Sequence, residues 1–366
     1  MARQRKGTNP SQVDGSERPY FIEAIRAAGE SDDGPTLIYA DFLEEQGESE
    51  RADFIRLQIE AARGRGDSSE RRHAIQRAIR GLLDTHAAVW RERELPLIPG
   101  LSWNHYERGL VRTITVNRLQ ILAEHADTIL NAAPVEGVLL RNPPFNSLVP
   151  DSQLNRVDDK ELDWIDHPVW DRFQRFDFKG CELKGRMGAL VERARWPRAR
   201  SLNLSGCRLE NGDLRGMAFG RWEPLTRVTK LNLNRNGFSD EGVIALAESL
   251  ACGAEELPLE TLMVAGSRES VWHEIENPEE PPRSLIQSIR ARFSAARQRR
   301  VTTGRFISEA RGGLSPEVIP ALVKLAKAAP GLRKLDLSDH PGLVEPSAIE
   351  PLEQLGVQVT IGIFRD

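Results

Sequence analysis

Residues 201–238 read SLNLSGCRLENGDLRGMAFGRWEPLTRVTKLNLNRNGF, and this stretch contains one pattern twice: L-x-L-x-x-N/C, followed by another apolar residue. Two further clear copies begin at residue 175 (RFDFKGCEL) and at residue 334 (KLDLSDHPGL). The equivalent positions Phe178, Leu204, Leu233 and Val264 lie 26, 29 and 31 residues apart. Self-similarity at a period of roughly 20–50 residues indicates stacked repeats, each of which buries its apolar side against its neighbours.

The strand pattern recurs in weaker form at Ile114/Val116, Val138/Leu140, Leu262/Val264 and Val357/Val359. Stretches with helical periodicity lie between the strands, at 119–132, 188–195, 240–252 and 316–328. Many of them end at a proline shortly before the next strand, where proline stops a helix. Strands that alternate with helices predict an α/β fold with a parallel sheet. We expect a curved solenoid over residues 107–366, with a concave sheet and convex helices.

The apolar residues of each L-x-L pair are expected to point into the core, because side chains alternate between the two faces of a strand. The residues beside them then face outward on the concave sheet, where they are candidates for binding a partner: Arg175, Asp177, Lys179, Ser201, Asn203, Ser205, Lys230, Asn232, Asn234, Lys334, Asp336 and Ser338. An alanine at Asn203 or Asn232 should therefore change the free energy of unfolding by less than about 0.5 kcal/mol.

The Asn or Cys three positions after the second apolar residue is expected to turn inward and bond to backbone groups that have left the strand ladder. Cys181, Cys207 and Asn236 occupy this position, which we call the slot. We therefore expect a structural role for Cys181 and Cys207, because their spacing follows the repeat and does not match a metal-ligand motif.

The N-terminal part of the chain has a different pattern. Residues 1–18 are polar and lack periodicity, which is typical of a flexible tail. Four amphipathic stretches with helical spacing follow within residues 19–95, and they predict a small all-α domain. Residues 91–106 form a short linker whose apolar side chains are expected to seal the first repeat against these helices: Leu95, Leu97, Ile98, Leu101 and Trp103.

The segment PYFIEAIRAAGESDDGPTLIYADFLEEQGESERADFIRLQIE (19–60) resembles the repeat-companion domain that accompanies leucine-rich repeats in bacterial proteins. The residues that carry the match are Phe21, Ile25, Arg26, Leu37, Tyr39, Ala40, Asp41, Leu43, Glu44, Glu45, Gly47 and 54–58. The match departs at Phe42, where the family usually has tryptophan. ERGLVRTITV (107–116) resembles the strand that opens the repeats in such proteins, and the repeats resemble the ribonuclease-inhibitor-like class. The resemblance implies a fold and no established activity.

Two segments interrupt the repeat, near 142–163 and 267–315. Insertions in repeat proteins map to loops on one face, which is often a functional face. The alternative for the second segment is a degenerate repeat near 305–308, next to a loop at 276–283.

Composition and motifs favour no enzyme, cofactor or metal site. The chain has 366 residues, with 50 Lys+Arg, 54 Asp+Glu and a net charge of −4. A protein that binds nucleic acid through its overall charge is basic, so this composition does not favour that class of function. It has three cysteines, and it lacks an H-E-x-x-H motif, a phosphate-binding glycine loop and a G-x-S-x-G motif. No apolar stretch reaches the roughly 18 residues of a membrane helix, and no secretion signal is visible. We therefore expect a cytoplasmic monomer.

Two binding functions remain open. The outward strand residues mix acids, bases and amides, which suits a protein partner bound across the concave face. The alternative is nucleic-acid or anionic-surface binding through residues 283–305, which hold seven arginines and no carboxylate on an amphipathic helical pattern. The residues for this alternative are Arg290, Arg292, Arg297, Arg299 and Arg300. We favour the protein partner, because no aromatic platform for bases accompanies the arginines.

Overall fold

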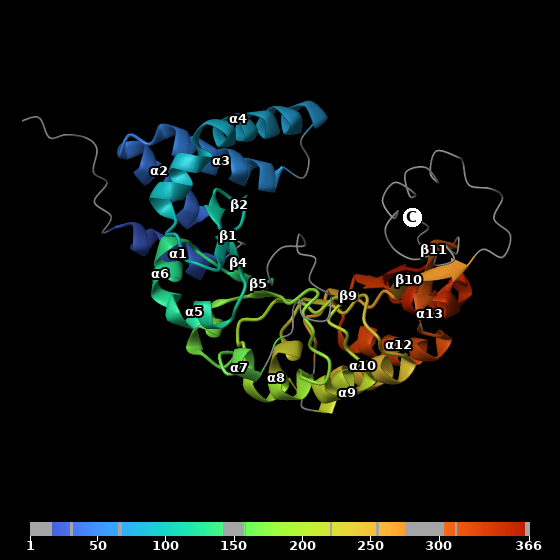
Figure 1. The fold of residues 1–366 in the computed structure, drawn as a ribbon. Helices are drawn as coiled ribbons and strands as arrows, with labels where there is room; N and C mark the ends of the chain where they lie inside the picture. Colours follow the sequence, from blue (N-terminus) through green and yellow to red (C-terminus); the bar gives the residue numbers. More distant parts are fainter. Residues whose placement is uncertain are drawn as a thin grey trace, which may run out of the picture.

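The structure is a computed structural model that describes residues 17–29, 32–64, 68–141, 157, 159–219, 222–253, 256–274, 304–311 and 313–362. Figure 1 shows a group of helices packed at one end of a curved sheet, with further helices along the outer side of that sheet. Of the predicted tail, residues 1–16 lie outside the described residues. The end of the tail was placed wrongly by one residue, because Arg18 already belongs to the first helix.

The N-terminal helices are α1 (Arg18–Ala28), α2 (Gly34–Glu45), α3 (Ser49–Arg63) and α4 (Ser69–Glu94). Local residues explain their ends. Pro19 stands in the first turn of α1, and Gly29 ends this helix with a φ of 69°. Ser68 caps α4, because its side chain accepts a hydrogen bond from Arg71 N at 3.2 Å.

Among the described residues, nine strands form one sheet in the order β1, β4, β5, β6, β7, β8, β9, β12, β13. The strands are β1 (Leu101–Trp103), β4 (Thr113–Val116), β5 (Gly137–Leu140), β6 (Arg175–Asp177), β7 (Ser201–Asn203), β8 (Lys230–Asn232), β9 (Thr261–Met263), β12 (Lys334–Asp336) and β13 (Gln358–Thr360). Strand β1 pairs antiparallel with β4, and every later pair is parallel. A short antiparallel pair, β2 (Tyr106–Glu107) and β3 (Leu110–Val111), lies between β1 and β4 in the chain.

Helices connect the parallel strands on one side of the sheet (Figure 1). They are α5 (Gln120–Glu124), α6 (Ala126–Ala132), α7 (Asp159–Leu162), α8 (Met187–Arg193), α9 (Asn211–Phe219), α10 (Asp240–Gly253), α12 (Ile319–Ala328) and α13 (Glu350–Glu353). The predicted helical stretches coincide with α5–α6, α8, α10 and the segment that ends in α12. The mixed α/β class with a mostly parallel sheet is therefore correct.

The predicted strand phase is confirmed. Leu202, Leu204, Leu231 and Leu233 are each at most 1% exposed, whereas the residues between them are half-buried. One core cluster extends from Phe54 of α3 through the linker and along the sheet. Of the five apolar linker residues predicted to seal the first repeat, Leu95, Ile98 and Leu101 are buried, but Leu97 is 97% exposed, so the sealing role predicted for Leu97 is wrong.

The described residues of the second interruption form an antiparallel strand pair, which we call the β10–β11 hairpin. Strand β10 (Ser267–Glu274) pairs antiparallel with β11 (Gly304–Arg311), and both lie outside the large sheet. Strand β9 pairs directly with β12, so the described residues between them add no strand to the large sheet. The degenerate repeat considered near 305–308 is wrong, because these residues belong to β11.

Candidate functional site

The register of the parallel strands arranges the outward side chains in two rows across the sheet. The first row is Arg175, Ser201, Lys230, Thr261 and Lys334. The second row is Asp177, Asn203, Asn232, Met263 and Asp336. The buried residues between the rows point toward the helices, so the rows occupy the opposite side of the sheet. We call this surface the open face.

The structure brings together all the β6, β7, β8 and β12 residues that the pattern predicts. Thr261 and Met263 complete the rows on β9 and are absent from the predicted set. The sequence contained the information needed to predict them, because the weaker copy of the strand pattern at Leu262 and Val264 places Thr261 and Met263 at the outward positions.

Four second-row side chains also hold the turn that follows their own strand. The oxygens of Asp177, Asn203, Asn232 and Asp336 accept the backbone N–H two residues later, at 2.9, 3.1, 3.0 and 3.0 Å. This contact is an Asx turn, in which a short side chain replaces a backbone acceptor. Asn203 and Asn232 therefore stabilise the fold, and the neutral effect expected for alanine at these two positions needs correction.

The residues after the strands differ in their access to solvent. Lys179 is exposed and Asn234 is half-buried, as a surface role requires. Ser205 and Ser338 are only 5% and 3% exposed, so their assignment to the partner-binding set is corrected. Both lie inside the turns that the second-row side chains close.

Charge is distributed unevenly over the open face. Arg175 Nη1 lies 2.7 Å from Glu107 Oε2, and Arg141 Nη2 lies 2.9 Å from Asp177 Oδ1. At the other end, Lys230 and Lys334 are exposed, and neither forms an ion pair with a described carboxylate. The two lysines of the rows without an ion pair therefore lie on β8 and β12, and β12 also carries the carboxylate of Asp336, which accepts from the uncharged Ser338 and Asn234.

The slot residues bond to backbone inside the core, as predicted. Cys207 Sγ donates to Phe178 O at 3.0 Å, and Asn236 Nδ2 donates to Leu204 O and Leu233 O at 2.9 and 2.8 Å. Burial raises the pKa of the Cys181 thiol to about 12 and raises the pKa of Cys207 further. Buried thiols that stay protonated are poor nucleophiles and poor metal ligands, so a structural role fits both.

His340 occupies the same slot in the repeat of β12. This residue was not predicted, because the pattern admitted only Asn or Cys at the slot. Its Nδ1 accepts the Leu314 N–H at 3.1 Å, and its Nε2 lies 2.6 Å from Val264 O. The ring is therefore neutral, with its proton on Nε2. His340 thus joins the two ends of the segment that carries the β10–β11 hairpin.

We expect His340 to make folding stability fall in mild acid. Burial lowers its pKa below the ordinary 6.5, despite the opposing hydrogen bond to Val264. The unfolded chain then binds the proton more readily, so this contribution is complete above pH 6.5 and is lost as the pH falls toward the folded pKa. Urea unfolding of the wild type and of His340→Asn, each at about pH 7.5 and at about pH 5.5, measures how much His340 contributes to the free energy of unfolding. The free energy of unfolding should depend less on pH in His340→Asn than in the wild type. An equal pH dependence in the two proteins would contradict the role given to His340.

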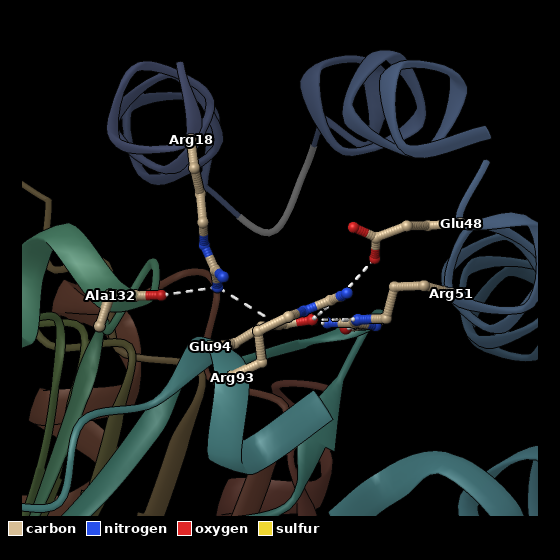
Figure 2. Close-up of polar contacts among 7 residues, drawn as sticks. Arg18, Glu48, Arg51, Arg93, Glu94 and Ala132 are labelled. Carbon is tan, nitrogen blue, oxygen red and sulfur yellow. Dashed lines mark hydrogen bonds and ion pairs between the residues drawn. The ribbon is translucent and has the colours of Figure 1, made fainter. Parts of the chain in front are cut away.

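A buried ion cluster joins the N-terminal helices to the rest of the chain, and we call it the Glu94 cluster (Figure 2). Glu94 binds Arg51 through two contacts, Nε–Oε1 at 2.8 Å and Nη2–Oε2 at 3.0 Å. Arg18 Nη2 lies 3.2 Å from Glu94 Oε2 and donates to Ala132 O at 2.9 Å. Arg51 Nη1 donates to Gly109 O at 2.8 Å. The cluster therefore links α1, α3 and α4 to the β2–β3 turn and to the end of α6.

Arg51 is also surrounded by rings, since its guanidinium carbon lies 5.1–5.5 Å from the centroids of Phe54, Trp90 and Tyr106. Burial alone would raise the pKa of Glu94, but the charge and hydrogen bonds of Arg51, together with the charges of Arg18 and Arg93, outweigh burial and hold the pKa below its ordinary value. Arg51 in turn has a raised pKa, because Glu94 outweighs the burial that would lower it. Both groups are therefore charged, and their role is to hold the helices in place.

The described part of the chain contains no cluster of three or more His, Cys, Asp or Glu side chains that could hold a metal ion. No helix among the described residues is long and apolar enough to cross a membrane. Arg290, Arg292, Arg297, Arg299 and Arg300, the residues of the alternative anion-binding prediction, lie outside the described residues.

Comparison with known proteins gives one family match. The family model described as Leucine Rich repeat matches residues 226–247, which contain β8, the slot residue Asn236 and the first half of α10. No curated protein matches the chain. The match identifies a leucine-rich repeat at this place. Leucine-rich repeats generally form interaction surfaces and not catalytic sites, which supports a protein-interaction module.

Proposed function

We propose that this protein is a non-enzymatic interaction module that binds another protein across the open face. In this proposal residues 107–366 form a leucine-rich-repeat solenoid of the ribonuclease-inhibitor-like class, and 19–95 form a helical repeat-companion domain, as in the bacterial proteins that the sequence resembles. The observation that carries the proposal is the pair of rows, which align ten side chains over β6, β7, β8, β9 and β12 on the side of the sheet opposite α8, α9, α10 and α12 (Figure 1).

The chemistry of the rows supports a protein partner over a nucleic acid. The rows contain cations, carboxylates, amides and hydroxyls, but no aromatic side chain on which a base could stack. Asp336 stands in the second row, where its carboxylate accepts hydrogen bonds from the uncharged Ser338 and Asn234 and would repel a phosphate backbone. The arginines named for the alternative, Arg290, Arg292, Arg297, Arg299 and Arg300, lie outside the described residues. We propose further that the protein acts in the cytoplasm as a monomer.

A bulky side chain in the middle of the open face should block the partner. The partner is first isolated by affinity purification of the tagged protein from its native cell, and its binding is then measured by calorimetry. Ser201→Trp and Thr261→Trp should each raise the Kd at least about tenfold, because they fill the space above β7 and β9.

Glu192→Trp on α8 is the matched control, since Glu192 is exposed on a helix on the other side of the sheet. Its Kd should equal that of the wild type. Normal binding by both open-face variants, or loss of binding in the α8 variant alone, would contradict the proposal.

A further inference from the structure

Every second strand of the first row carries a cation, and the strands between carry a small hydroxyl. The order across the sheet is Arg175, Ser201, Lys230, Thr261, Lys334. Neighbouring strands lie about 4.8 Å apart, so the backbone positions of successive cations are about 10 Å apart. In a peptide in the polyproline II conformation, which has three residues per turn, residues three positions apart lie on the same side and are separated by about 9 Å.

The described carboxylates near the rows are already engaged. Glu107 binds Arg175 and also accepts from Thr113 Oγ1 at 3.1 Å. Asp177 binds Arg141. Asp336 accepts from Ser338 N at 3.0 Å and from Ser338 Oγ at 2.7 Å. Lys230 and Lys334 therefore keep their charges without a carboxylate partner in the described chain.

We propose that the first row binds an acidic segment of the partner protein in the polyproline II conformation, with carboxylates three residues apart on Lys230 and Lys334. Thr261, which lies between the two lysines in the register, can donate its hydroxyl to the same segment. This inference rests on the proposed function, and it adds the chemistry of the partner. Uncompensated lysines favour a partner of opposite charge, because electrostatic complementarity determines which partner binds.

An acidic peptide fits the rows better than a nucleic acid. Asp336 follows Lys334 by two residues and therefore stands on the same face of the sheet. A phosphate chain would bring negative charge to this carboxylate at every step. A peptide can place an uncharged residue there and still offer carboxylates to both lysines.

The test uses the full chain and a labelled twelve-residue peptide, (Glu-Ser-Gly)₄, in a fluorescence anisotropy titration. The wild type should bind this peptide, and it should bind (Gln-Ser-Gly)₄ at least about tenfold more weakly. Binding should weaken with added salt, because exposed charges are screened. An oligonucleotide with four phosphates should bind more weakly than the glutamate peptide.

The double variant Lys230→Gln/Lys334→Gln should raise the Kd for the glutamate peptide at least about tenfold. The matched control is Lys324→Gln/Lys327→Gln, which removes two exposed lysines from α12 on the other side of the sheet and should bind as the wild type does. Failure of the wild type to bind the glutamate peptide, equal binding of both peptides, tighter binding of the oligonucleotide, or an unaffected double variant would each overturn the inference.

The isolated partner separates this inference from the proposed function. If Thr261→Trp abolishes partner binding and Lys230→Gln/Lys334→Gln leaves it intact, the open face is the binding site and the acidic segment is wrong. If neither variant weakens partner binding, both proposals fail. Loss of partner binding in both variants, with the α12 control intact, supports both.

Discussion

Glu94→Gln is expected to lower the free energy of unfolding by about 3–5 kcal/mol, which is typical when one member of a buried ion pair is removed. The substitution keeps the shape of the side chain but leaves Arg51, whose side chain is 1% exposed, without its counter-charge among three aromatic rings. Urea unfolding of the full chain at neutral pH measures the loss.

Glu44→Gln is the matched control for the Glu94 cluster. Glu44 also pairs with an arginine, Arg56, at 2.6 Å, but the Glu44 side chain is 53% exposed. Because solvent screens exposed pairs, the control should cost at most about 1 kcal/mol. Equal losses in the two variants would show that the Glu94 cluster does not hold the helices.

The same carboxylate should make the protein sensitive to acid. The folded pKa of Glu94 lies below its ordinary 4.5, so the folded chain binds this proton less readily than the unfolded chain does. Its stabilising contribution is therefore present above pH 4.5 and is lost as the pH falls through the folded pKa. The decrease in stability below pH 4.5 should be smaller in Glu94→Gln, because glutamine does not titrate.

Leu204→Ala and Leu233→Ala should each lower the free energy of unfolding by about 2–5 kcal/mol, as truncations in a packed core do. Both side chains are fully buried under the open face. Asn203→Ala and Asn232→Ala, each one residue earlier in the chain, should cost about 0.5–1.5 kcal/mol, because each loses the hydrogen bond that closes its Asx turn.

Denaturant unfolding of these four variants distinguishes the two kinds of position. Equal losses at the leucines and asparagines would mean that the strand phase is wrong. Losses near zero at both asparagines would mean that the Asx turns do not contribute to stability in solution.

The sequence predicted the parts of the fold that repeat locally. Alternating apolar residues at 202 and 204 or at 231 and 233 determine which side of a strand is buried, and helical spacing located α8 and α10 within one or two residues. The alternation of apolar residues and the helical spacing each depend on neighbouring residues, so a single copy of the repeat is enough to predict its strand and its helix. The same alternation predicted most residues of the open face, because these residues alternate with the buried ones along each strand.

The features that the sequence did not predict depend on contacts between residues that are distant in the chain. Arg18, Arg51 and Glu94 belong to separate amphipathic helices in the sequence, and only the packed helices bring their charges together. The β10–β11 hairpin pairs residues that lie 30 (Glu274 and Gly304) to 44 (Ser267 and Arg311) positions apart and follows no repeat, so periodicity could not find it. His340 was missed for a chemical reason, since a neutral imidazole can donate and accept hydrogen bonds as the asparagine amide does.

The most direct test of the central claim, that the partner binds across the open face, is a lysine-reactivity footprint of the complex. The purified protein is acetylated with and without saturating partner, and the modification of each lysine is quantified by mass spectrometry. Lys230 and Lys334 should be protected in the complex, whereas Lys327 on α12 and Lys184 before α8 should remain as reactive as in the free protein. Protection of Lys327 and Lys184 with unchanged reactivity at Lys230 and Lys334 would contradict the claim and assign the partner to the helical side.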